Sequence, residues 1–453
     1  MSVWNPRPGA AIITLTLAVT PLTIGLATTG PASAAAAATY YVDAVNGNDA
    51  AAGTTPATAW RTLTKASTAP LAPGGKLLLA RGSTWKGQQL AITGSGTSAA
   101  PIVVDAYGAA AARPIVAGHD EACVSLEGGH IELYNLQIGL AVDGSRCTWA
   151  GVKVTGDDNV VERNLITGAA AGVYIEKGVR YTAITANDLI DNNYMSKLTP
   201  TDVNDNDDAG AFAILVQGDD SNIGWNEIRG STAFSYDYGT DGAAVEIFLG
   251  SRNRVHHNVA IDNETFTELG TSRDVNADGS PVDPDGTSGN VFEYNVITGP
   301  RTQGGLVTRG PQEPGEDPDP NGPVLGTVFR NNSVRLTHAD SQGVVCDAGC
   351  TDAHLSMSQN IIQAVVKTAY GPNVTDSHHN VFYGARQHQM GGSANVTADP
   401  MFDLTDAANP LKLRAGSPAI DLGITRFSDD DVTGRAIDGS DGPVDAGAYE
   451  YDK

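Results

Sequence analysis

Apolar and polar residues alternate in short segments along most of the chain, and this alternation predicts strands rather than helices. In residues 243–250, AAVEIFLG, apolar side chains occupy every second position at Val245, Ile247 and Leu249, and a glycine closes the run. Similar runs that end in glycine occur at 171–178, 211–218, 264–270 and 304–310. Each run is typical of a strand that is buried on one face.

An asparagine motif repeats through the same region, with an apolar residue usually three positions before the asparagine and two after it. The motif predicts one short strand and a turn in each copy, and neighbouring copies are as little as 20 residues apart, which suits one coil of a solenoid. Its copies are centred on Asn135, Asn164, Asn187, Asn226, Asn258, Asn295, Asn332, Asn360 and Asn380. We therefore predict an all-β fold, a right-handed parallel β-helix with asparagines stacked at one corner. A β-sandwich would explain the strands but not the recurrent asparagine.

The composition of the chain limits the kinds of molecule that it is expected to bind. The chain has 453 residues, with 52 Asp and Glu against 28 Lys and Arg, and a formal net charge of −24. Such a charge argues against nucleic acid and against anionic membranes as partners. A neutral substrate, or an acidic one bridged by metal ions, stays open.

The amino-terminal segment has the pattern of an export signal. Arg7 precedes an apolar run at 10–27, and the small residues 32–34 end it. We expect a signal peptide at residues 1–34 and a secreted, extracellular protein; the alternative is a membrane anchor. Export suits disulfides between the four cysteines, for which three pairings exist. Local pairing is the simplest, joining Cys123 to Cys147 and Cys346 to Cys350.

Both ends of the expected mature chain resemble a known family. Residues 39–66, TYYVDAVNGNDAAAGTTPATAWRTLTKA, and residues 71–87, LAPGGKLLLARGSTWKG, are similar to the cap and first coils of secreted right-handed β-helix proteins of the pectate-lyase-like superfamily. Residues 399–423 and 442–450 resemble the last coils of that group. The resemblance implies the fold and a tendency to act on carbohydrates. It suggests an N-terminal cap with first coils at 35–100, a β-helix core at 101–395, and C-terminal coils with a cap at 396–453.

Insertions indicate which face of the β-helix carries the functional site. The spacing between ladder asparagines rises to 32–39 residues from Asn187 to Asn332, so consecutive coils carry long inserts. Stacked coils place such inserts side by side, and we expect them to wall a groove. Tyr236 and Tyr238 in one insert are candidates for stacking on sugar rings. A set of solvated acidic loops is the plainer interpretation.

Alternation sends Glu246 and Phe248 outward from the coil, and counting back from the next closing glycine sends Glu268 and Phe266 outward too. If the two glutamates are offset by one residue pair on adjacent coils, their Cα atoms are about 8 Å apart. Inverting glycosidases hold their carboxyl groups roughly 6.5 to 9.5 Å apart. The glutamates are therefore candidates for general acid and base, with ordinary surface acids as the alternative.

Other acids add to this picture. Asp208 and Asp241 precede equivalent strands and form a second candidate catalytic pair, about 5 Å apart, unless they only shape turns. The insert DVNADGSPVDPD at 274–285 has the oxygen-ligand spacing of a calcium loop. Its candidate ligands are Asp274, Asn276, Asp278 and Asp285. A flexible acidic loop explains the same residues, so calcium is only a possible cofactor.

Three functions fit these features. We favour a glycoside hydrolase that acts on a polysaccharide or oligosaccharide through the carboxylates. A calcium-dependent polysaccharide lyase is the alternative, with Lys177, Arg273 or Arg309 as base; Arg309 is also a candidate for binding substrate. A non-catalytic carbohydrate-binding protein is the third. No sequence motif for an organic cofactor is present, so we expect none.

Overall fold

The computed structural model describes residues 37–198, 208–273, 280–312, 319–347, 349–384, 389–437 and 442–452. The signal peptide predicted at residues 1–34 lies outside the described residues and stays a prediction. Residues from Ala37 onward form one compact unit. None of its described helices is long and apolar enough to cross a membrane.

Three long parallel sheets account for most of the described strands. Sheet A has the order β1 (Thr39–Val42), β2 (Lys76–Ala80), β5 (Ile102–Tyr107), β8 (Ile131–Tyr134), β11 (Val160–Glu162), β14 (Ala183–Thr185), β19 (Asn222–Gly224), β24 (Arg254–His256), β27 (Val291–Glu293), β30 (Thr327–Arg330), β33 (Leu355–Ser358) and β36 (Ser377–His378). Sheet B has the order β3 (Thr84–Lys86), β6 (Ile115–Ala117), β9 (Gln137–Gly139), β12 (Leu165–Thr167), β15 (Asp188–Ile190), β20 (Glu227–Arg229), β25 (Val259–Ile261), β28 (Val296–Gly299), β31 (Ser333–Leu336), β34 (Ile361–Gln363), β37 (Val381–Tyr383) and β38 (Val396–Thr397).

Sheet C carries the candidate site. Its order is β4 (Leu90–Ile92), β7 (Val124–Leu126), β10 (Ala150–Val154), β13 (Ala171–Ile175), β18 (Phe212–Val216), β23 (Ala243–Phe248), β26 (Thr265–Gly270), β29 (Gly304–Arg309), β32 (Gln342–Asp347) and β35 (Lys367–Tyr370). The short elements are the helices η1 (Pro56–Thr58) and α1 (Leu63–Ala66) and the antiparallel pairs β16 (Met195–Ser196) with β17 (Ala209–Gly210), β21 (Ala233–Ser235) with β22 (Gly239–Asp241), and β39 (Phe402–Asp403) with β40 (Lys412–Leu413).

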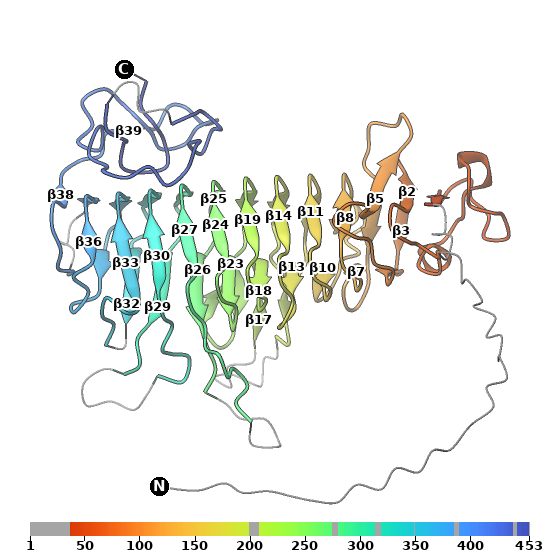
Figure 1. Cartoon of the computed structure of the whole chain (residues 1–453), viewed down its shortest axis with the longest axis horizontal. Coiled ribbons are helices and arrows are strands. Elements are labelled where there is room, and N and C mark those ends of the chain that lie inside the picture. The colour runs from red at the N-terminus through yellow and green to blue at the C-terminus, as the bar shows by residue number, and fades with distance from the viewer. Residues whose placement is uncertain are drawn as a thin grey trace, which may run out of the picture. The chain divides into compact units, whose positions relative to one another are not determined.

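Each full coil contributes one strand to each sheet, and Figure 1 shows successive coils side by side in chain order. The inward positions are apolar: Val245 and Ile247 of β23 are fully buried, in line with their alternation. Leu249 was expected inward as well, but β23 ends at Phe248 and Leu249 lies half-buried in a turn with φ of 76°. The fold is therefore the predicted parallel β-helix.

The predicted asparagine ladder is confirmed. The Nδ2 of each member donates to the Oδ1 of the next at 2.9–3.2 Å, from Asn164 through Asn187, Asn226, Asn258, Asn295, Asn332 and Asn360 to Asn380, and Asn395 extends the series. The amides satisfy buried backbone groups at a turn, which would otherwise cost free energy. The looser copy at Asn135 was misplaced by one residue: Leu136 occupies the ladder position, and Asn135 donates instead to Asp105.

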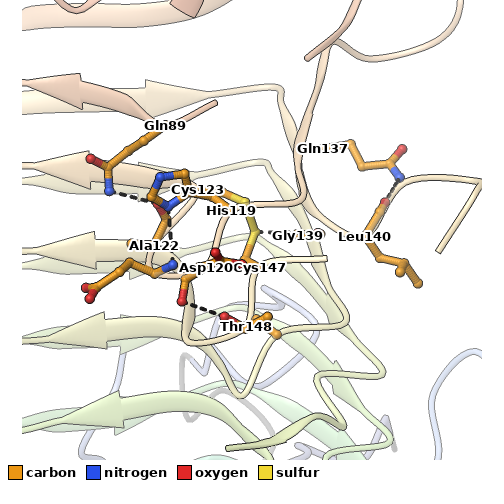
Figure 2. The surroundings of a disulfide bond; sticks show 12 residues. Gln89, His119, Asp120, Ala122, Cys123, Gln137, Gly139, Leu140, Cys147 and Thr148 are labelled. Atoms are coloured by element: carbon orange, nitrogen blue, oxygen red, sulfur yellow. Dashed lines mark hydrogen bonds between the residues drawn. A yellow bond between two sulfur atoms is a disulfide. The ribbon is translucent and has the colours of Figure 1, made fainter. Parts of the chain in front are cut away.

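Both locally paired disulfides are present, Cys123–Cys147 and Cys346–Cys350. Figure 2 shows the first, which ties the chain just before β7 to the loop that precedes β10. Because β7 and β10 pair directly, this disulfide links adjacent coils of sheet C.

The two ends of the stack differ. At the N-terminal end, Trp60 and Leu63 are buried in the main core, so the segment around α1 covers the first coils. At the other end, coils were expected over residues 396–453, but β38 is the last strand in the stack. The chain after β38 packs its Phe402 and Leu411 against Val296 and Ile361 of sheet B. This C-terminal region thus lies against the side of several coils.

Candidate active site

Glu246 and Glu268 lie directly opposite each other on neighbouring strands. The register pairs Glu246 of β23 with Glu268 of β26, and Phe248 with Gly270. The separation of about 8 Å expected from the sequence was therefore wrong, because the closing glycines Gly250 and Gly270 are not equivalent positions. The Cα atoms are one strand spacing apart, about 4.8 Å.

The outward orientation expected for Phe266 was also wrong. Strand pairing joins Ala243 to Thr265 and Val245 to Thr267, and Phe266 between them is fully buried. Its ring packs against Phe292 at a centroid distance of 6.2 Å. Phe266 and the next residue, Thr267, are both fully buried, so simple alternation fails at this point of β26. Phe266 belongs to the core and does not face substrate.

A cavity of about 390 Å³ surrounds the glutamate pair. Strands β23, β26 and β29 form its floor, the β21–β22 hairpin borders one end of these strands, and the segment after β29 borders the other. Its lining residues are Asp208, Phe212, Tyr238, Thr240, Asp241, Gly242, Glu246, Phe248, Glu264, Thr265, Glu268, Arg309 and Asn321. Inserts of consecutive coils thus meet at one site, and this site holds all four predicted catalytic carboxylates.

Carboxyl groups in the cavity have raised pKa values. Burial, together with the charges of Glu268 and Asp241, raises the pKa of Glu246 well above its ordinary range, although Glu246 keeps some surface in the cavity. Burial also raises the pKa of Asp241 to about 7, and the charges of Glu268 and Asp208 add to this effect. Burial with the charges of Asp241 and Glu268 raises the pKa of Glu264 to about 7. These groups hold protons at a pH where ordinary carboxyls are ionised.

Glu268 has a different environment from its partner Glu246. The guanidinium of Arg309 donates to Glu268 Oε1 and to the carbonyl of Leu269, the second at 2.8 Å. Burial lowers the pKa of Arg309, but the neighbouring acids Glu268, Glu246 and Asp319 together outweigh burial and raise it. Glu268 is thus ion-paired with a cation, whereas burial and the neighbouring acids raise the pKa of Glu246.

Asp208 holds the hairpin that walls the cavity. Its Oδ2 accepts from Ser235 Oγ at 2.8 Å and from the backbone N–H of Tyr236 at 2.7 Å. Asp208 is only 6% exposed. Its Oδ2 also accepts from the backbone N–H of Asp237 at 3.3 Å, so this oxygen binds the turn at 235–237. These contacts fit a positioning role for the wall better than contact with substrate.

The predicted aromatic residues divide between wall and surroundings. Tyr238 lines the cavity with 53% of its surface exposed, and Phe248 lines it from the floor. A Cβ at position 270 would lie 2.5 Å from the Phe248 ring, so Gly270 allows the ring to lie across the neighbouring strand. Tyr236 is not among the lining residues; it packs edge-on against Phe234 at 4.9 Å.

Sequence reasoning missed Glu264. It lies immediately before β26, and its Oε2 is buried without a hydrogen-bond partner among the described residues. One signal for Glu264 was present in the sequence, its position at the start of the glycine-terminated run 264–270. The rest of its environment comes from the β21–β22 hairpin, which belongs to the preceding coil.

The predicted calcium loop lies only partly within the described residues. Asp274, Asn276 and Asp278 lie outside the described residues, so this site stays a prediction. Asp285 is described and lines a separate small cavity with Lys177 and Asp283. Within the described ranges, no group of three or more His, Cys, Asp or Glu side chains has the arrangement of a metal site.

Comparisons with known proteins agree on the fold. The chain matches no protein-family profile. A segment of 85 residues is 40% identical to a lacto-N-biosidase of Bifidobacterium longum, but it spans 18% of this chain and only 5% of that protein's length. Among solved structures, the lacto-N-biosidase of family GH136 from Eubacterium ramulus is similar with a TM-score of 0.54 at 15% identity, over 79% of this chain and 67% of that one.

Two further structures are similar over more of the chain. The pectate lyase Pel9A has a TM-score of 0.54 at 17% identity, over 91% of this chain and 96% of that one. XylC, solved with xylose, has a TM-score of 0.52 at 9% identity, over 92% and 98%. At these identities the similarity establishes the architecture, a parallel β-helix, and leaves the reaction open.

Proposed function

We propose that this protein is a glycoside hydrolase that cleaves a polysaccharide or oligosaccharide in the sheet C cavity. The observation that carries the proposal is the contrast within one registered pair: Glu268 is ion-paired with Arg309, while burial and the neighbouring acids raise the pKa of Glu246. Glycosidic cleavage uses two carboxyl groups with opposed protonation. The exposed aromatic ring of Tyr238 suits a sugar face at the wall of the same cavity.

In this mechanism Glu246 donates its proton to the leaving glycosidic oxygen. Burial of Glu246, with the charges of Glu268 and Asp241, keeps that proton on Glu246 before the reaction. As the bond between the anomeric carbon and the leaving oxygen breaks, the Glu268 carboxylate attacks the anomeric carbon and forms a glycosyl-enzyme ester. Water then releases the sugar from Glu268 while the ionised Glu246 takes a proton from that water, which restores both groups. Retaining enzymes hold their two carboxyl groups about 5 to 5.5 Å apart, and inverting enzymes hold them roughly 6.5 to 9.5 Å apart. The spacing of neighbouring strands, about 4.8 Å, is closer to the retaining distance. We therefore propose retention of the anomeric configuration.

Elimination by a lyase has less support from the same geometry. Arg309 is engaged by Glu268 and stays charged, which makes it a poor base. Lys177 bonds to the carbonyl of Val282 outside the cavity, and Arg273 donates to the carbonyls of Gly322 and Pro311. An excess of carboxyl groups over cations would also repel a uronate polymer unless cations bind with it.

A panel of neutral and acidic polysaccharides tests the proposal, with reducing ends and ultraviolet absorbance of unsaturated products measured together. Reducing ends without unsaturation are expected, and loss of this signal in the Glu246→Gln and Glu268→Gln variants assigns it to the cavity. Glu176→Gln is the matched control, because Glu176 lies just after β13 of the same sheet and pairs with Lys153 outside the cavity. Proton NMR of the first product anomer then tests retention. Unsaturated products would contradict the proposal and identify a lyase.

A further inference from the structure

A second cavity lies where the C-terminal region meets sheet A. Its volume is about 420 Å³, and it shares no lining residue with the carboxylate cavity on sheet C. Trp225, Arg254, His256 and His257 line it from the β-helix, and the segment 426–430 lines it from the C-terminal region. Nothing in the proposed hydrolysis uses this cavity.

An ordered stack of aromatic rings forms one side of it. The indole of Trp225 is 38% exposed and stacks on His257 at 4.2 Å, and His257 stacks on the buried Tyr294 at 5.2 Å. His257 Nε2 lies 2.9 Å from the carbonyl of Asp430, and its Nδ1 lies 2.8 Å from that of His256. Burial lowers the pKa values of both histidines, so the rings behind the indole are uncharged at neutral pH. Trp225 thus presents a fixed apolar face to the cavity.

A buried acid orients the arginine beside this face. Glu293, with a side chain only 1% exposed, accepts from Nε of Arg254 at 2.5 Å and from Arg330 at 2.6 Å. The Arg330 guanidinium in turn lies 3.9 Å from the ring of Phe427, another lining residue. Among the described residues, Glu293 is the only hydrogen-bond or ion-pair partner of the Arg254 side chain, and it is bound through Nε. Its two terminal nitrogens stay available, and 44% of the side chain is exposed.

A second cation lies on the opposite rim. Arg426, with a side chain 47% exposed, donates to Asp429 at 3.1 Å and to the carbonyl of Ile437. Asp429 is itself 91% exposed, so water screens its charge strongly. Arg254 and Arg426 are thus the two cations of a cavity that Trp225 also lines, together with Asp429 and Asp430.

We propose that this cavity binds an acidic saccharide, with the sugar ring against the Trp225 indole and the sugar carboxylate on the terminal nitrogens of Arg254. Guanidinium and carboxylate match as a planar two-point contact, and an indole face suits the C–H face of a sugar. Arg426 adds positive charge at the rim. This cavity shares no lining residue with the carboxylate cavity, so variants test the two sites separately.

Three small probes separate the parts of this recognition. Glucuronic acid has both ring and carboxylate, glucose has the ring alone, and acetate has the carboxylate alone. By calorimetry on the whole protein, glucuronic acid should bind at least about tenfold more tightly than either of the others. Its affinity should fall as salt is added, because ions screen the arginines.

Variants place the site. Trp225→Ala and Arg254→Lys should each weaken glucuronic acid by about tenfold, since the first removes the stacking face and the second removes the planar fork. Tyr181→Ala is the matched control: Tyr181 is an exposed ring, 52% exposed and 5.1 Å from Arg180, but it lines neither cavity. If Arg254→Lys fails to fold, Arg426→Gln replaces it, with a smaller loss expected.

Three outcomes would overturn the proposal: no saturable binding of glucuronic acid, equal binding of glucose, or binding that survives both variants. Glu246→Gln separates this proposal from the hydrolase proposal. It should abolish turnover and leave glucuronic acid binding unchanged. Loss of binding in Glu246→Gln would move the ligand to the carboxylate cavity and contradict the second site.

Discussion

Glu246 and Glu293 are both glutamates crowded by protein, on different sheets of one β-helix, and their neighbours have opposite charge. Glu293 lies between Arg254 and Arg330, and both its oxygens are paired. Burial raises the pKa of Glu246, and the charges of Glu268 and Asp241 beside it raise that pKa further. A paired buried acid is a structural element, whereas an acid buried beside other acids keeps a proton it can donate. The sign of the neighbouring charge therefore separates the two roles better than burial does.

The largest expected effect is on turnover. Glu246→Gln and Glu268→Gln should each lower kcat by about two to four orders of magnitude, because the first removes the general acid and the second removes the carboxylate that attacks the sugar. The measurement is initial rate on whichever glycan of the panel the wild type cleaves. Near-normal turnover in both variants would reduce the pair to ordinary surface acids, and Asp241 with Glu264 would become the better candidates.

Glu293→Gln should act on stability instead. Removing the acid leaves two arginines without their shared partner, and the free energy of unfolding should fall by about 3 kcal/mol. Denaturant unfolding measures this, with Glu246→Gln as the control that keeps or gains stability at pH 8. If Glu293→Gln melts like the wild type while Glu246→Gln unfolds, the comparison between the two glutamates is wrong.

Asp241 offers an intermediate effect that depends on pH. Its folded-state pKa is about 7, above the value of 3.8 for an unfolded chain. A raised carboxyl pKa stabilises the fold fully below the unfolded value, and this contribution is lost as pH rises through the folded value. Wild-type stability should therefore fall between pH 4 and 7 by at most about 4 kcal/mol from this group, at about 1.4 kcal/mol per pKa unit.

Asp241→Asn removes that titration. The variant should lose less stability than the wild type between pH 4 and 8, as measured by thermal melting across the range. Asp403→Asn is a suitable control, because Asp403 lies on the hairpin β39–β40 and hydrogen bonds from Thr405 lower its pKa. Parallel pH curves for wild type and Asp241→Asn would show that the carboxyl titrates normally.

The repeat was readable because its cause is local. A ladder asparagine needs the same turn in every coil, so its spacing in the sequence reports coil length directly, and Asn187, Asn226 and Asn258 align as expected. The same logic identified the coils with inserts. Asn135 shows the limit: it resembles the motif but occupies the preceding residue of the turn, which has positive φ.

The site was only partly readable because register and bends are set between strands. The outward direction of Glu246 and Phe248 follows from alternation near the end of β23. The position of Glu268 depends on which residues pair across strands. Phe266 is buried next to the buried Thr267, which strict alternation does not predict. Glu264 gains its environment only from Asp241 and Glu268 in space. Local pattern predicts strands and faces, while pairing decides which acids meet.

The smallest effect concerns the aromatic floor beside Glu246. Phe248→Ala should raise KM by about three- to tenfold and leave kcat nearly unchanged, because a stacking face binds substrate and transition state alike. The ring lies over Gly270, so its removal opens the floor without disturbing the inward side of β23. Tyr383→Ala is the control, an exposed ring on sheet B that is 38% exposed and outside the cavity. Steady-state kinetics on a cleaved oligosaccharide gives both constants. A fall in kcat equal to that of Glu246→Gln would mean that Phe248 positions the acid. That result would contradict the role of Phe248 as a substrate-binding surface.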